Sequence, residues 1–147
     1  MKAAITSEVL ERTGVRHGFS TRAAGSLDEL GLSCARLGIE ERRLVLLQQV
    51  HGADVVVAGE KDLERFRAER PVADAAVTAE DRITVGVRTA DCLPVLLAAG
   101  DGAVVAAAHA GWRGVLAGVV PATVERMASL GAEPRRLVAA LGPSIRP

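Results

Sequence analysis

The stretch ITVGVRTADCLPVLLAAGDGAVVAAAHAGWRG, residues 83–114, decides the expected fold. It contains short apolar runs rich in Val, Leu and Ala, and glycine, aspartate or proline stands at the ends of these runs. We predict strands at 83–88, 93–98 and 103–109, with a turn at Gly100-Asp101-Gly102 between the last two. Neighbouring strands without an intervening helix indicate a sheet rather than a helical bundle.

The flanking sequence adds further strands and helices to this sheet. Helical spacing runs from Val115 to Leu130, and Pro121 inside it is expected to kink or split the helix. Before the quoted stretch we expect a short strand running into a loop at 15–22, a loop with one helical turn at 23–36, and two strands or one bent strand at 44–50 and 54–58. An exposed helix is expected at 60–70, ended by Pro71. Further strands are expected at 75–78 and 137–141. Strands and helices do not alternate regularly, so we predict the α/β (α+β) class, a mixed sheet with helices packed on it.

The composition and net charge exclude several classes of protein and partner. The chain has 147 residues, with 18 basic and 18 acidic side chains, a hydrophobic fraction of 49% and a charged fraction of 24%, which excludes disordered and collagen-like proteins. Net charge is zero and no basic stripe is visible, so a nucleic acid polymer is not an expected partner. No GxGxxG motif follows a strand and no P-loop is present. No repeat or linker divides the chain, so we expect one domain spanning 1–147.

The expected location follows from cysteine usage and from the apolar segments. Two cysteines, Cys34 and Cys92, are too few for a disulfide framework. The first residues carry no long apolar segment typical of a signal peptide. The longest nearly uncharged stretch, 92–100, is too short to span a bilayer. We therefore expect a cytoplasmic protein without a membrane partner.

The candidate chemistry lies in histidines and one cysteine. His17, His51 and His109 each stand at the edge of an apolar run beside glycine, and Cys92 occupies a comparable junction. Ends of strands beside glycines are places where a rigid scaffold positions functional groups. Imidazole and thiolate suit zinc, and a cysteine beside a histidine equally suits a thiol nucleophile with its base. The spacing from 51 to 92 to 109 matches no compact zinc finger, so both interpretations stay open.

Two further features have a structural and a functional interpretation. Gly111-Trp112-Arg113-Gly114 is either a plain helix entry or a phosphate site built from a helix start and Arg113. Asp91 is either a turn residue or a group that orients or deprotonates something beside Cys92. Arg22 and Arg88 are solvated surface residues unless an anionic ligand engages them.

Four strings of sequence carry a resemblance to a known family. They are HGFSTR at 17–22, QVHG at 49–52, RTADCLPV at 88–95 and AHAGWRG at 108–114, and the match extends through GPSI at 142–145. In this order they resemble the YfiH-like family, also called the laccase-domain, polyphenol oxidase or peptidoglycan-editing family. The resemblance implies a mixed β-sheet sandwich with flanking helices, related to a group of predicted cysteine hydrolases.

The resemblance also implies a site and an activity. It implies a metal site of His51, Cys92 and His109, holding zinc or alternatively copper. It implies a purine nucleoside phosphorylase, which splits adenosine, inosine or methylthioadenosine with phosphate into base and ribose 1-phosphate, with adenosine deamination as a side activity. The expected catalytic residues are Cys92, His109, Asp91 and His17. The expected substrate- and phosphate-binding residues are Arg88, Arg113 and Arg22.

The chain departs from the family pattern in two places, and other functions are compatible with the same residues. The segment between Arg22 and Leu44 is shorter than in the family, and the sequence ends at Pro147, before a Cys-Tyr-Glu-Val motif and a C-terminal part. We therefore expect a shortened or oligomer-completed form, including a homo-oligomer. The alternatives are a hydrolase with Cys92 as nucleophile and His109 as base that edits peptidoglycan precursors, a copper-dependent polyphenol oxidase, and an inactive scaffold.

Overall fold

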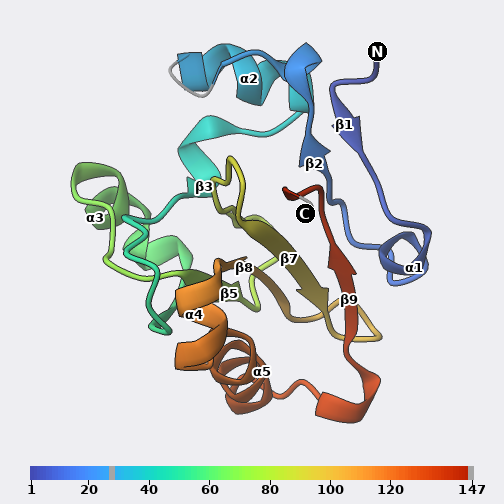
Figure 1. The fold of residues 1–147 in the computed structure, drawn as a ribbon, viewed down its shortest axis with the longest axis vertical. Helices are drawn as coiled ribbons and strands as arrows, with labels where there is room; N and C mark the ends of the chain where they lie inside the picture. The colour runs from blue at the N-terminus through green and yellow to red at the C-terminus, as the bar shows by residue number, and fades with distance from the viewer. Residues whose placement is uncertain (27–28, 146–147) are drawn as a thin grey trace.

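A mixed five-stranded sheet forms the centre of the protein in the computed structural model, which describes residues 1–26 and 29–145 (Figure 1). Its strand order is β4-β5-β8-β7-β9. The strands are β4 (Val55–Val57), β5 (Ala75–Thr78), β8 (Val105–Ala110), β7 (Leu93–Ala98) and β9 (Val138–Leu141). The pairing of β4 with β5 is parallel, whereas every other pairing in this sheet is antiparallel.

Two helices pack on one face of this sheet. The helix α5 (Val119–Ser129) contacts β4, β5 and β8, and α4 (Trp112–Ala117) follows directly from the end of β8. Alanines at alternate positions of β8 face α5 and are buried in the same apolar cluster as Val119 and Met127. Their small side chains let the helix lie close to the strands, which suits a chain with an aromatic content of 2%.

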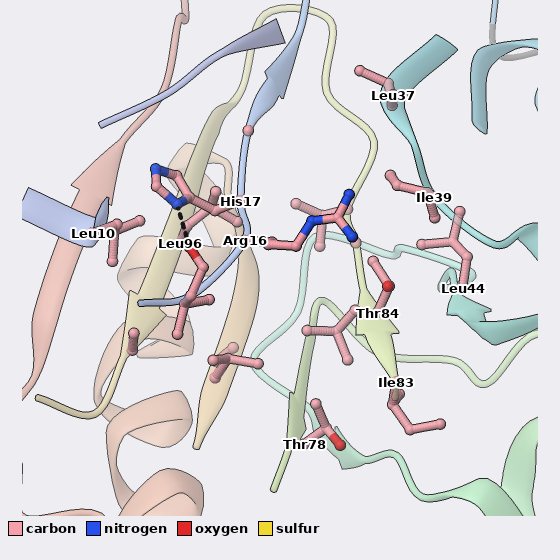
Figure 2. Close-up of a pocket in the computed structure, with 18 of the residues that line it drawn as sticks. Leu10, Arg16, His17, Leu37, Ile39, Leu44, Thr78, Ile83, Thr84 and Leu96 are labelled. Carbon is pink, nitrogen blue, oxygen red and sulfur yellow. Dashed lines mark hydrogen bonds between the residues drawn. The ribbon is translucent and has the colours of Figure 1, made fainter. Parts of the chain in front are cut away.

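The N-terminal third and a second small sheet lie over the other face. In the two additional pairs, β1 (Ala4–Ile5) is antiparallel to β2 (Phe19–Ser20), and β3 (Leu44–Val45) is parallel to β6 (Thr84–Val85). The remaining α-helices are α1 (Glu8–Glu11), α2 (Leu30–Leu37) and α3 (Leu63–Ala68). Short 3₁₀ turns cover 22–24, 41–43, 60–62 and 134–136. A cavity of about 1330 Å³ is lined by this segment, β6 and β7 (Figure 2). Beside it, Leu10 and Phe19 pack in one apolar cluster with Ala98 and Ala140 of the central sheet.

The predicted α/β class with flanking helices is confirmed, and the predicted strands at 75–78 and 93–98 have the observed bounds. Other expectations differ from the structure. The strand predicted at 83–88 is reduced to β6, and the loop predicted at 23–36 contains the two-turn helix α2. The segment 1–13, for which the sequence predicts no element, holds β1 and α1. Residues 27–28 of that predicted loop, and 146–147 at the end of the predicted domain, lie outside the described residues.

The break in the C-terminal helical segment lies at Gly118, and the expectation of a break at Pro121 is wrong. Gly118 has φ +90°, a left-handed conformation that ends α4 and caps the start of α5. Pro121 follows in the first turn of α5, where backbone N–H groups have no partner within the helix, so the proline costs little. Among the described residues, no helix has the length and apolar character needed to cross a membrane.

Candidate metal centre

The structure brings together three side chains that are distant in the sequence. One potential ligand atom from each of His51, Cys92 and His109 lies within 4.8 Å of the others. The two imidazole rings approach edge to face, with centroids 4.8 Å apart and planes at 71°. His109 is buried, Cys92 is half-buried and His51 is exposed, so the cluster opens to solvent on one side.

The register of the central sheet places Cys92 and His109 side by side. Leu93 pairs with Ala110 and Pro94 pairs with His109, so Cys92 lies opposite Gly111, just beyond the paired residues. A Cβ atom on Gly111 would stand 2.9 Å from the Cys92 Sγ and 3.1 Å from the His51 Cδ2. Glycine is therefore required at this position, because any side chain would occupy the space between two of the three groups.

The donor set fits a zinc ion of the catalytic type. Two imidazole nitrogens and one thiolate are ligands that zinc prefers, and three protein ligands leave a fourth position open. A tetrahedral zinc ion keeps such ligands about 3.4–3.7 Å apart. The observed separations of up to 4.8 Å therefore require adjustments of roughly 1 Å to close on one ion.

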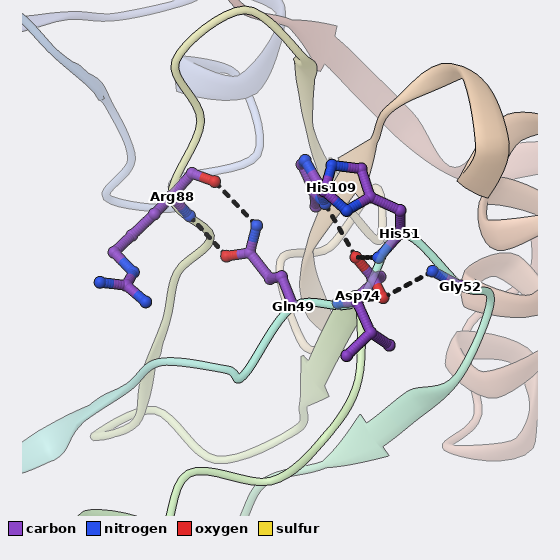
Figure 3. Close-up of polar contacts among 7 residues, drawn as sticks. Gln49, His51, Gly52, Asp74, Arg88 and His109 are labelled. Carbon is purple, nitrogen blue, oxygen red and sulfur yellow. Dashed lines mark hydrogen bonds and ion pairs between the residues drawn. The ribbon is translucent and has the colours of Figure 1, made fainter.

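A carboxylate that sequence reasoning missed, Asp74, lies beneath the cluster. It immediately precedes β5, and its side chain has no exposed surface. The β5–β8 register places it opposite His109, whose backbone N–H donates to the Asp74 carbonyl oxygen over 2.7 Å. The His109 Nδ1 also lies 2.8 Å from the Asp74 Oδ1. Two contacts therefore join these residues, one through the backbone and one through the side chain, and Figure 3 shows the second.

The loop that carries His51 wraps around the same carboxylate. The backbone N–H groups of Val50, His51 and Gly52 donate to Asp74 over 3.1, 2.9 and 2.8 Å. His51 has φ +62°, and no other non-glycine residue in the described part of the chain has a positive φ. Burial of the Asp74 carboxyl raises its pKa, but the hydrogen bonds from His109 and from these three N–H groups outweigh burial, so its pKa is lowered overall. Asp74 is therefore ionised at neutral pH.

A second polar contact fixes the neighbouring loop. The Gln49 side chain accepts from the Arg88 backbone N–H over 2.8 Å and donates to the Arg88 carbonyl oxygen over 2.7 Å (Figure 3). The amide of Gln49 thus both accepts from and donates to one backbone residue, as a residue of a neighbouring strand does. The two hydrogen bonds join the loop before His51 to the loop before Cys92. The Arg88 backbone is thereby fixed, while its exposed side chain extends away from His51 and His109 (Figure 3).

The remaining predicted site residues divide into two groups. Asp91 adjoins Cys92 and is exposed, and Arg113 lies on α4 two residues beyond Gly111. The Arg113 guanidinium stacks 5.1 Å from the centroid of the Trp112 ring, whose residue is 68% exposed. Both residues are therefore near neighbours of the cluster in sequence, and neither lies among its ligand atoms.

His17 and Arg22 flank β2 in the N-terminal segment, outside the cluster. His17 borders the 1330 Å³ cavity, but both of its ring nitrogens contact backbone groups. Its Nε2 accepts from the Ser7 N–H over 2.9 Å. Its Nδ1 donates to the Val15 carbonyl oxygen over 2.9 Å, which is the dashed contact in Figure 2. Arg16 points the other way and donates to the Gly38 carbonyl oxygen.

Comparison with known proteins assigns the family. A family model described as multi-copper polyphenol oxidoreductase laccase matches residues 16–147. The chain belongs to this laccase family. A Streptomyces coelicolor protein named purine nucleoside phosphorylase is 50% identical over 116 residues, which cover 78% of this chain and 46% of that protein. A protein named adenosine deaminase RL5, from an unknown prokaryotic organism, is 40% identical over 114 residues, covering 75% of this chain and 44% of that protein.

A solved structure agrees with this assignment to the laccase family. YlmD from Geobacillus stearothermophilus matches with a TM-score of 0.66 and 29% identity, over 76% of this chain and 43% of YlmD. The chain therefore spans about half the length of the relatives it matches. The predicted resemblance to the laccase-domain family is confirmed.

Two residues of this laccase-family site carried a signal that sequence reasoning passed over. Asp74 stands inside the apolar run VADAAV at 72–77, and a carboxylate within a buried strand is rare unless it is paired. Gln49 is one of two glutamines in the chain and directly precedes Val50-His51. Neither feature reveals its partner, because both contacts join residues more than 30 positions apart.

Proposed function

We propose that this protein is a zinc-dependent enzyme of purine nucleoside phosphorolysis, with its metal held by His51, Cys92 and His109. The observation that carries the proposal is the convergence of these three ligand atoms within 4.8 Å. The relative at 50% identity, which is named purine nucleoside phosphorylase, supports the reaction class. Because the chain spans about half of that relative, the activity is a proposal for the protein and not a property carried over.

Zinc suits this donor set better than a multicopper arrangement. A multicopper enzyme needs many histidine ligands, and the sequence contains three histidines, of which His17 is engaged by backbone groups. Two histidines and one cysteine remain, which can hold a single zinc or a single copper ion. A bound zinc ion supplies Lewis acidity and activates a coordinated water.

The protein's own residues offer positions for the anionic co-substrate. Arg88 is exposed while its backbone is fixed by Gln49, so its guanidinium can engage phosphate with two N–H groups. Arg113 stands beyond Gly111 and can supply a second positive charge. We assign Asp91 to substrate contact or proton transfer beside Cys92. His17 and Arg22 are weaker candidates, because they lie on the N-terminal segment.

The decisive experiment measures adenine release from adenosine in phosphate buffer, together with the metal content of the purified protein. We expect one zinc per chain, and adenine and ribose 1-phosphate as products. Cys92→Ala and His51→Ala should abolish both metal content and activity. Cys34→Ala is the matched control, since it also removes a thiol but lies outside the cluster. Absence of phosphate-dependent adenine release from the zinc-loaded protein would overturn the proposal.

Adenosine deamination is the second candidate, favoured by the relative named adenosine deaminase RL5. Zinc-activated water can attack the purine C6. Inosine and ammonia formed from adenosine without phosphate would identify this reaction in the same assay. The hydrolase alternative, with Cys92 as nucleophile and His109 as base, makes the opposite prediction for metal. It requires a chelated protein that stays active and is inactivated by alkylation of Cys92.

We also propose a homo-oligomer, since α4 carries three neighbouring exposed apolar side chains, those of Trp112, Val115 and Leu116. Trp112 and Leu116 on α4 are 68% and 79% exposed. The molecular mass in solution, measured by light scattering with and without zinc, tests this proposal. A monomer under both conditions contradicts it.

A further inference from the structure

We propose that Asp74 is the positioning residue that prepares both histidines for metal binding, by fixing the tautomer of His109 and the backbone of His51. The inference rests on the metal centre proposed above. It adds a residue that belongs to none of the four sequence strings carrying the family resemblance. Four hydrogen bonds converge on this one buried carboxylate.

Each oxygen of the carboxylate accepts two hydrogen bonds. Oδ1 accepts from the His51 backbone N–H over 2.9 Å and faces the His109 Nδ1 at 2.8 Å. Oδ2 accepts from the N–H groups of Val50 and Gly52 over 3.1 and 2.8 Å. A carboxylate has about four acceptor positions, so this arrangement uses all of them. Asp74 therefore has no free acceptor position for substrate or solvent, and the residue is fully buried.

The contact with His109 determines which ring nitrogen can bind a metal. The Asp74 carboxylate accepts three backbone N–H groups and is likewise the acceptor in its contact with His109, so the His109 Nδ1 carries the hydrogen. A neutral imidazole has one N–H, which leaves the lone pair on Nε2. Nε2 is thus the metal-binding nitrogen, and the ring is already in the correct tautomer before an ion arrives. A carboxylate behind a ligating histidine is a recurrent feature of zinc sites.

The contact with the loop determines the position of His51. Three consecutive N–H groups can point at one anion only if the chain turns sharply, and the left-handed His51 provides this turn. Without the anion these N–H dipoles would repel one another, and His51 could relax to an ordinary conformation. Its ring would then move away from the Cys92 thiol.

The substitution Asp74→Asn isolates this role because it keeps the shape of the side chain. An amide has one oxygen, so its NH₂ group must replace either Oδ1 or Oδ2. If NH₂ replaces Oδ2, it faces the N–H groups of Val50 and Gly52. If NH₂ replaces Oδ1, it donates to the His109 Nδ1 and forces the hydrogen onto Nε2. The second arrangement removes the lone pair that metal binding requires, as in the wrong tautomer of a serine-protease triad whose aspartate is replaced by asparagine.

The experiment reads the tautomer and the metal affinity separately. Long-range ¹H–¹⁵N spectra of the metal-free protein identify the protonated nitrogen of His109. Cobalt(II) titration then follows the thiolate-to-cobalt absorption band. Asp54→Asn is the matched control, because it makes the same change at an exposed carboxylate on the loop that contacts the Asp74 backbone. An amide spectrum like that of the unsubstituted protein verifies the fold of each variant.

We expect the Nδ1–H tautomer in the unsubstituted protein and in Asp54→Asn. Asp74→Asn should show Nε2–H, alone or mixed with Nδ1–H, and a cobalt affinity about 10- to 100-fold lower. Cobalt affinity within twofold of the unsubstituted protein in a folded Asp74→Asn overturns the proposal. If that variant does not fold, Nδ1–H in the unsubstituted protein supports the proposal and Nε2–H overturns it. A protein that binds no cobalt contradicts the proposed metal centre, whereas the tautomer still decides the role of Asp74.

Discussion

Replacing Gly111 by alanine would place a single methyl group between two of the proposed ligands. The residue has φ −67° and ψ 160°, an extended conformation that alanine adopts freely, so the change introduces no backbone strain. The new Cβ would lie 2.9 Å from the Cys92 Sγ and 3.1 Å from the His51 Cδ2. Its effect therefore arises from steric contact at the cluster and not from the backbone.

The size of the effect follows from these distances. Ordinary contact between non-bonded heavy atoms needs about 3.5–4.0 Å, so Cys92, His51 or the backbone must move by roughly 0.5–1 Å. Metal–ligand distances in a bound site hold to about 0.2 Å. The ligands must move together by roughly 1 Å to reach such distances. A methyl group between two of them opposes this movement, so we expect Gly111→Ala to weaken cobalt or zinc binding at least about tenfold. Overpacking should also lower the free energy of unfolding by about 1–3 kcal/mol.

Competition with a chromophoric chelator measures the metal affinity, and urea unfolding measures the stability. Gly86→Ala is the matched control, because its Cβ would meet only the ends of two flexible leucine side chains, at 3.3 and 3.4 Å. We expect that variant to bind metal as the unsubstituted protein does. Equal metal affinity in Gly111→Ala and Gly86→Ala would show that the ion does not occupy the space between Cys92 and His51, and the reasoning would be refuted.

Four further predictions concern the rest of the chain. Burial raises the pKa of the Cys34 thiol in the folded protein. The stabilisation by this thiol is therefore fully present below its unfolded pKa of about 8.5 and is lost as the pH rises. The difference in unfolding free energy between the unsubstituted protein and Cys34→Ala should shrink above about pH 9, and a difference that stays constant with pH contradicts this. At neutral pH, iodoacetamide should label half-buried Cys92 and spare buried Cys34, as peptide mass spectrometry would show. Gln49→Ala removes both hydrogen bonds to the Arg88 backbone and should cost about 1 kcal/mol in urea unfolding, because the contact is exposed; no loss would mean that water replaces the amide. Gly118→Ala forces alanine to φ +90° and should cost about 1–2 kcal/mol, although nothing obstructs its methyl group; an unchanged melting temperature would count against the left-handed break.

The central strands were predictable because they are continuously apolar and end at glycine, proline or aspartate. The strands at 75–78 and 93–98 are internal strands of the sheet, and a short continuous apolar run of this kind is typical of an internal strand. A strand of six residues was predicted at 83–88, but β6 contains two residues, because its pairing with β3 extends over two residues only. The helix break was misplaced for a different reason. Proline disrupts a helix only at positions beyond the first helical turn. The sequence does not show that a new helix begins after Gly118, which places Pro121 in the first turn of that helix.

The candidate site was predictable only in part. The three ligands are recognisable one by one, since each stands beside a glycine at the end of an apolar run, and the family resemblance joined them. The supporting residues were not predictable from any local pattern. Asp74 contacts His109 because of the β5–β8 register, and the register becomes visible only when the strands are paired. Gln49 similarly contacts a backbone 39 residues away.

The strand directions explain why the site forms at one end of the sheet. β5 and β7 both begin where β8 ends, because both are antiparallel to β8. Asp74 before β5, Cys92 before β7 and His109 at the end of β8 therefore meet, and the parallel β4–β5 pair adds the loop of His51. All ligands and their buried carboxylate thus come from residues 51–109, within a chain that spans about half of its relatives. Metal binding is therefore expected to require only these strands, whereas substrate binding can depend on groups elsewhere, and metal affinity is the sharper first test of the site.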